Sequence, residues 1–223
     1  MDGLGTLPTT AEYSASYAND VSADGSTVVG ISIGGEAGEA FRWNAGVMSG
    51  LGSLGGAQYS DASDISADGS VVVGGTSDGQ AFRWAGGVTT GLESLPGGQY
   101  SWADAISADA RVIVGYSDDS AGNTLAVRWT DGVISSLDDF PDGVRSSVAT
   151  GVSADGEVVV GYLTSPSVTA GVSYGAFRWT EGEMLALGFL QEGYVHSFAR
   201  AVSADGPVVV GQAYRQTDDR AFI

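Results

Sequence analysis

Residues 65–74 read Ile-Ser-Ala-Asp-Gly-Ser-Val-Val-Val-Gly, a tight-turn tetrapeptide followed at once by an apolar run that ends in glycine. The tetrapeptide Ser-Ala-Asp-Gly begins at Ser22, Ser66, Ser153 and Ser203, and a variant ending in Ala110 begins at Ser107. The five copies are separated by 44, 41, 46 and 50 residues, about 45 on average. Five such units account for nearly all of the 223 residues, so the chain is predicted to be a single domain of repeats.

Every unit has the same order of segments. A Ser-x-Ala-x-x-Val/Ile segment precedes the turn, and an Ala-Phe-Arg-Trp segment and a Leu-x-x-Leu or Leu-x-x-Phe ending follow the apolar run. Short runs of Val, Ile and aromatic residues, separated by Gly, Asp and Ser, are typical of strands. No stretch shows a sustained apolar period of 3.6 residues, which argues against helices. The Val-rich runs do not alternate with polar residues, which indicates strands buried on both faces.

Four short antiparallel strands per unit predict an all-β fold, a five-bladed β-propeller. We expect one domain, 1–223, with blades at 4–50, 51–91, 92–136, 137–186 and 187–223. Residues 2–7 match the ending of a unit, whereas the fifth unit stops at Ile223, in its third strand. Residues 1–7 are therefore expected to complete the fifth blade and close the ring, which leaves few unpaired strand edges. An open solenoid is the alternative, although β-helix coils are usually shorter than these units.

The segments at 51–56 (Leu-Gly-Ser-Leu-Gly-Gly), 65–74 and 80–84 (Gln-Ala-Phe-Arg-Trp) together resemble the HAF family of probable extracellular repeats, over essentially the whole chain. The histidine of that family's His-Ala-Phe motif is replaced in all five units, by Glu39, Gln80, Leu125, Gly175 and Arg220. The resemblance implies a secreted or surface-exposed bacterial protein and no catalytic residues. No signal peptide is visible, so we expect a mature or excised fragment.

The composition excludes several classes of function. There are 27 acidic and nine basic residues, and the net charge of −18 argues against nucleic-acid binding. The sequence has no long apolar run, so no membrane span is expected. The lack of cysteine excludes disulfides and thiolate chemistry, and the single His196 is expected to be a surface or packing residue. The acidic, lysine-free surface suits either high salt or secretion of a highly soluble protein.

A candidate ligand site involves the first segment of each unit. Trp102 is the only one of five tryptophans outside the Ala-Phe-Arg-Trp position, and it occupies the variable place of Ser-x-Ala. By analogy with other propellers, this first strand lies nearest the central channel, where aromatic side chains suit stacking on a sugar ring or peptide side chain. Packing between blades is the alternative interpretation of Trp102. The candidate ligand-binding residues are Trp102, Tyr17, Phe198, Asp61, Asp104 and Arg200.

Residues that recur in the units are expected to be structural. The turn aspartates should cap their turns, since calcium needs several converging oxygens, although a structural Ca²⁺ at the Asp-rich loops is an alternative. No other cofactor is expected. The strand arginines should pair with a carboxylate or carbonyl between blades, and the strand tryptophans should pack blades together. These are Asp24, Asp68, Asp109, Asp155 and Asp205; Arg42, Arg83, Arg128 and Arg178; and Trp43, Trp84, Trp129 and Trp179.

These features favour a non-enzymatic extracellular or cell-surface binding module with a glycan or surface protein as ligand. One alternative is a structural repeat domain of a surface layer, fibre or autotransporter passenger that self-associates. A glycoside hydrolase is a further alternative, because such enzymes need paired carboxylates. Its candidates would be Asp20, Asp61, Asp64 and Asp104 on the first strands.

Overall fold

The computed structural model describes residues 3–137, 146–165, 173–190, 194–215 and 218–223, and within these ranges the chain is all-β and contains no helix. The strands are β1 (Ser14–Val21), β2 (Thr27–Gly34), β3 (Ala37–Asn44), β4 (Val47–Gly50), β5 (Ser60–Ile65), β6 (Val71–Thr76), β7 (Ala81–Ala85), β8 (Val88–Gly91), β9 (Ser101–Ile106), β10 (Val112–Asp118), β11 (Thr124–Thr130), β12 (Val133–Ser136), β13 (Ser147–Val152), β14 (Val158–Ser165), β15 (Ser173–Thr180), β16 (Glu183–Gly188), β17 (His196–Val202), β18 (Val209–Arg215) and β19 (Asp218–Phe222).

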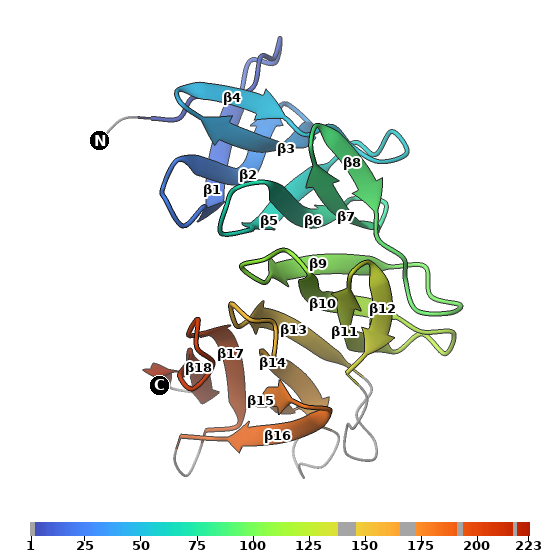
Figure 1. Cartoon of the computed structure of the whole chain (residues 1–223), viewed down its shortest axis with the longest axis vertical. Helices are drawn as coiled ribbons and strands as arrows, with labels where there is room; N and C mark the ends of the chain where they lie inside the picture. The colour runs from blue at the N-terminus through green and yellow to red at the C-terminus, as the bar shows by residue number, and fades with distance from the viewer. Residues whose placement is uncertain (1–2, 138–145, 166–172, 191–193, 216–217) are drawn as a thin grey trace.

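Each of the first four units forms an antiparallel sheet of four strands in sequence order, as predicted. The fifth unit contributes β17, β18 and β19, and one parallel pair, Tyr174 with His196, links β17 to β15 of the fourth sheet. The first strands of neighbouring sheets contact one another, and Figure 1 shows the sheets following one another along a curved array. The first strands therefore form the inner side of the array.

The expected closed ring is not formed. Figure 1 shows the first and last sheets at the two ends of an open arc. The described residues before β1 form no strand, and within the described part of the chain β19 pairs only with β18. The backbone N–H of Leu7 donates to Ser32 Oγ at 2.9 Å, and Ser16 Oγ donates to the Gly5 carbonyl at 2.7 Å. These bonds hold the amino-terminal segment on the first sheet, and within the described residues it forms no strand pair with β19.

A β-bulge in every first strand explains the glycine that ends each apolar run. The pairing with the second strand skips one residue in each unit: Asn19, Ser63, Asp104, Thr150 and Arg200. The bulge brings a first-strand carbonyl close to the opposite glycine, so that a Cβ on Gly74 would collide with the Asp61 carbonyl. The same collision arises at the other four equivalent glycines, and glycine is therefore required there.

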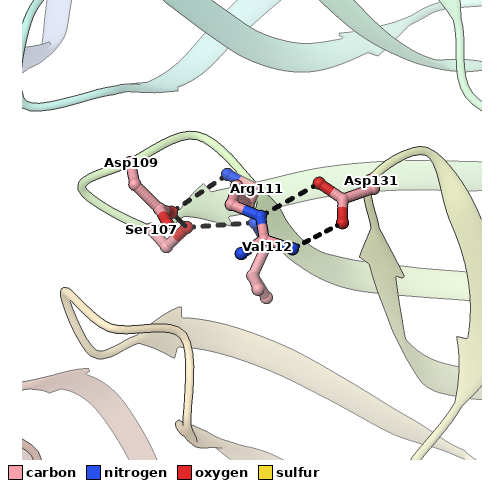
Figure 2. Close-up of polar contacts among 5 residues, drawn as sticks. All are labelled: Ser107, Asp109, Arg111, Val112 and Asp131. Atoms are coloured by element: carbon pink, nitrogen blue, oxygen red, sulfur yellow. Dashed lines mark hydrogen bonds and ion pairs between the residues drawn. The ribbon is translucent and has the colours of Figure 1, made fainter.

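The Ser-x-Asp turn is fixed by its own side chains, as Figure 2 shows for the third unit. Ser107 Oγ donates to Asp109 Oδ1 at 2.8 Å and accepts the backbone N–H of Val112 at 3.0 Å. Asp109 Oδ1 also accepts the N–H of Arg111 at 3.1 Å, and these bonds hold the pKa of Asp109 below its usual value. The first, second and fourth units repeat the pattern, so in these four units the aspartates cap their turns as expected.

Backbone and serine hydrogen bonds join neighbouring sheets. The N–H of Ala23 donates to the Ala67 carbonyl at 3.0 Å, and equivalent bonds link each of the following turns to the next. Ser60 Oγ of the second sheet accepts the N–H of Ala40 in the first at 3.0 Å, a contact that recurs between all later sheets. Between the sheets lie apolar clusters of Val, Leu, Ala, Phe and Trp side chains. The stacking of the sheets therefore buries both faces of the Val-rich strands, as their sequence pattern indicates.

The strand arginines differ from expectation. Within the described residues, the ion pairs involve Arg111, Arg215 and Arg220 and none of the strand arginines. Instead, the Arg42 guanidinium lies 5.9 Å from the ring centroid of Trp84 in the next sheet, and that of Arg128 lies 5.5 Å from Trp179. The guanidinium is weakly hydrated and planar, so it stacks on the neighbouring indole in place of a carboxylate.

Candidate binding site on the inner strands

The candidate residues lie on the first strands β1, β5, β9 and β17, where they fall into separate groups. Asp61 on the second sheet accepts a hydrogen bond from Asn19, which lies two residues after Tyr17 on the first strand of the first sheet. Phe198 and Arg200 lie on the fifth, and the Arg200 guanidinium is 5.5 Å from the Phe198 ring centroid. The structure does not gather all six candidate residues into one pocket.

Trp102 packs between the second and third sheets. Its Nε1 donates to Ser63 Oγ of the preceding first strand at 3.2 Å. A Cβ on Gly75 would collide with the indole, so the ring lies against the backbone of β6. The half-buried indole thus makes the contacts of a packing residue, the alternative interpretation of this tryptophan.

The first-strand carboxylates considered for glycoside hydrolysis hold the sheets together. Asp20 Oδ2 accepts the N–H of Ile65 in the next sheet at 3.1 Å, and Asp64 Oδ2 accepts that of Ile106 at 2.8 Å. Burial and the adjacent Asp20 carboxylate raise the pKa of Asp64. Asp61 accepts a hydrogen bond from Asn19 Nδ2 at 2.8 Å, which opposes the increase in its pKa caused by burial. Asp20, Asp61 and Asp64 therefore each form a hydrogen bond between neighbouring sheets.

Asp104 is the exception among these carboxylates. Its Oδ2 is buried and has no hydrogen-bond partner, and burial raises its pKa to about 7. At the equivalent bulge positions, Asn19 Nδ2 donates to the Ala62 carbonyl and Thr150 Oγ1 to the Ala199 carbonyl, both at 2.8 Å. An ionised carboxylate cannot donate, so Asp104 does not make this bond in its charged form.

An aromatic cluster on β14, β15, β17 and β18 surrounds Phe198. The Phe198 ring centroid lies 4.9 Å from that of Tyr162, 5.1 Å from Tyr174 and 5.6 Å from Tyr214. His196 lies 5.4 Å from Tyr174, so the single histidine is a member of this cluster. The Asp104 charge raises and the Arg200 charge lowers the pKa of Tyr162, whose net increase comes mainly from burial. The charges of Asp104 and Arg200 therefore act on the pKa of this one tyrosine in opposite directions.

The tyrosines of this cluster are not among the residues predicted from the sequence. Tyr162 follows the glycine of the apolar run and pairs with Val148 across the bulged strand, as Tyr116 and Gln212 do with Trp102 and Phe198 in their units. For Tyr162 this place, directly opposite the variable position of Ser-x-Ala, was the available signal, whereas Tyr174 and Tyr214 lie elsewhere in their units. What sequence position did not reveal was that the fourth and fifth units would bring four rings together.

Comparisons with known proteins give the fold and no family. No family model and no curated protein matches the chain. Solved structures similar to it include TolB from Acinetobacter baumannii, with a TM-score of 0.54 and 13% identity over 90% of this chain and 52% of that one. A putative TolB from Agrobacterium tumefaciens has a TM-score of 0.57 and 16% identity, over 91% and 73%.

A structure from a study of two prolyl endopeptidases has a TM-score of 0.61 and 10% identity over 93% of this chain. The chain spans about half of the Acinetobacter TolB and 33% of the prolyl endopeptidase. At these identities the likeness concerns the fold alone, which is that of a β-propeller. The described residues contain no helix long and apolar enough to cross a membrane. The chain is thus an all-β array of propeller blades.

Proposed function

We propose that the chain is a non-enzymatic extracellular or cell-surface binding module that takes its ligand on strands β14, β15, β17 and β18 of the fourth and fifth units. The observation that carries the proposal is the half-buried aromatic cluster around Phe198, with Arg200 beside it. Aromatic faces next to a guanidinium suit a sugar ring or a side chain of a partner protein, because both offer apolar faces and hydrogen-bonding groups. A surface glycan or a surface protein is therefore the proposed ligand.

The hydrogen bonds of the first-strand aspartates favour a binding function over glycoside hydrolysis. A glycoside hydrolase needs one acidic group free to donate a proton and a second free to act as nucleophile or base. Asp20, Asp61 and Asp64 accept hydrogen bonds from the fold, which leaves Asp104 without an available carboxylate partner among the four. The HAF resemblance, which implies no catalytic residues, points the same way.

A binding measurement with matched variants tests this proposal. The purified chain is applied to a glycan array and to immobilised bacterial surface proteins, with and without calcium, as wild type, Phe198→Ala and Tyr17→Ala. Tyr17 occupies the same position of the first sheet and lies outside the cluster. Binding lost in Phe198→Ala and retained in Tyr17→Ala supports the proposed site. Binding that survives Phe198→Ala refutes it, and concentration-dependent assembly without any ligand favours the self-associating structural domain.

A further inference from the structure

The arginine of the Ala-Phe-Arg-Trp segment stacks on an indole of the next sheet at two interfaces and does not at a third. Arg42 lies 5.9 Å from the ring centroid of Trp84, and Arg128 lies 5.5 Å from that of Trp179. Arg83 of the second sheet makes no ring contact, ion pair or side-chain hydrogen bond within the described residues. Its guanidinium, which carries five N–H donors, is therefore unpaired there.

The burial of Trp129 in the third sheet accounts for this difference. Trp129 is fully buried in a cluster with Val71 and Ile113, and its Nε1 donates to the Glu93 carbonyl at 2.8 Å. The other two indoles, which carry the stacked arginines, are only partly buried. The apolar side chains that enclose Trp129 leave Arg83 without an exposed indole to stack on.

Arg83 instead lines a cavity of about 570 Å³ between the second and third sheets. The wall of this cavity carries the charged residues Arg83, Arg111, Asp109 and Asp131 and the apolar residues Val71 and Ile113. A concave site of this size, with an apolar part and a few polar groups that converge on it, is typical of a small-molecule site.

Arg111 is a residue that the third unit alone has at its place after the turn. The other units have Ser26, Ser70, Glu157 and Pro207 there. Asp131 Oδ1 accepts from Arg111 Nε at 3.1 Å and Asp131 Oδ2 accepts from Nη2 at 2.8 Å, as Figure 2 shows. Both side chains are more than half exposed, so this pair adds little stability. Its effect is to fix the guanidinium beside the cavity with three N–H donors left for a ligand.

Two ionised carboxylates complete the polar wall. A backbone hydrogen bond from Arg111 holds the pKa of Asp109 below its usual value, and a side-chain hydrogen bond from Arg111 does the same for Asp131. Both carboxylates are therefore hydrogen-bond acceptors at neutral pH. The cavity thus offers guanidinium donors that suit a carboxylate and carboxylate acceptors that suit hydroxyl groups, beside an apolar surface.

We propose that this cavity binds an acidic sugar, whose carboxylate pairs with Arg83 and Arg111 and whose hydroxyl groups donate to Asp109 and Asp131. A neutral sugar would leave Arg83 without a counter-ion, and a simple carboxylate would leave the two aspartates unused. The site lies between the second and third sheets, so it is separate from the cluster around Phe198 and independent of the function proposed for that cluster.

Sodium glucuronate is the probe, and its binding can be followed by NMR titration of the full chain. About 0.15 M NaCl screens the repulsion between this anion and a chain of net charge −18. We expect saturable binding, with an affinity at least about tenfold higher than for glucose, which lacks the carboxylate, or for acetate, which lacks the hydroxyl groups. Arg83→Gln should reduce the affinity for glucuronate at least about tenfold. Arg42→Gln is the matched control, because it makes the same change of charge at the same strand position and lies outside the cavity.

Arg111→Ser provides a second test, because it introduces the residue that the first two units carry at this place and should keep the turn intact. It should weaken glucuronate binding about fivefold or more through the lost guanidinium. Thermal melts identify any variant that fails to fold, and Arg111→Ser then replaces Arg83→Gln in the comparison.

Three results would each overturn the proposal: no saturable binding of glucuronate, equal affinity for glucose or acetate, or equal effects of Arg83→Gln and Arg42→Gln. Glucuronate binding that Phe198→Ala abolishes and Arg83→Gln leaves unchanged would assign the acidic sugar to the aromatic cluster, and would likewise overturn the proposal.

Discussion

Replacing Asp104 by asparagine should stabilise the fold at neutral pH and leave it little changed in acid. The pKa of Asp104 is raised by burial from its usual 3.8 to about 7. Between these two values the unfolded chain ionises at this residue while the folded chain keeps the proton, so the folded state loses stability as pH rises. At about 1.4 kcal/mol per pKa unit, the loss reaches about 4 kcal/mol above pH 7.

Asparagine removes this loss and adds a donor. A neutral amide at position 104 can donate to the Ala149 carbonyl, as Asn19 donates to the Ala62 carbonyl at the equivalent bulge. The expected difference in unfolding free energy between Asp104→Asn and wild type is therefore close to zero at about pH 4 and up to about 4 kcal/mol at about pH 8. Urea denaturation at both pH values, read by circular dichroism, gives the two differences.

Asp24→Asn is the control of opposite sign. Asp24 accepts hydrogen bonds from the backbone N–H of Ser26 and from the Ser22 hydroxyl, which lower its pKa to about 2. Its ionised form therefore stabilises the fold at neutral pH, and this contribution is lost as pH falls through the folded-state pKa. If Asp104→Asn gives the same change at both pH values, or destabilises the fold at pH 8, then the carboxylate is ionised and paired, and the reasoning is refuted.

Three further predictions concern the repeat. Gly161→Ala should destabilise the fold by about 3 kcal/mol or more, because its Cβ would collide with the Val148 carbonyl, whereas Gly175→Ala, which has room, should change stability by less than about 1 kcal/mol in urea denaturation. Ser153→Ala should cost about 1–3 kcal/mol in the same assay, because it removes a bond to Asp155 and leaves the buried N–H of Val158 unpaired; an unchanged midpoint would contradict this. The melting temperature should rise by about 5 °C between low salt and about 1 M NaCl, since salt screens repulsion within a chain of net charge −18; flat calorimetric melts would exclude this effect.

The candidate site could be read from the sequence only in part. The variable position of Ser-x-Ala indicated the inner strands, and it singled out Phe198 and Arg200, which the structure places beside each other. The same reasoning singled out Trp102, which packs against β6 and Ser63. Residue type alone could not distinguish the roles of Trp102 and Phe198, because each role depends on the neighbouring sheet. That sheet places Gly75 beside the Trp102 ring and Tyr162 beside the Phe198 ring.

The sequence by itself determined the strands, the turns and the stacking of sheets, because these depend on local chemistry that recurs in each unit. An Asp that caps its own turn and a glycine required opposite a bulge both act within one blade. The same residues therefore recur in each unit, and their role can be predicted from the sequence. Whether the ring closes depends on how the sheets stack on one another, which is set by the packing of every interface together. In the structure the first and last sheets lie at the two ends of an open arc, and the described residues before β1 form no strand with β19. Only the tertiary structure could decide this, since the relative placement of the first and last sheets depends on all the interfaces between them and on no single residue.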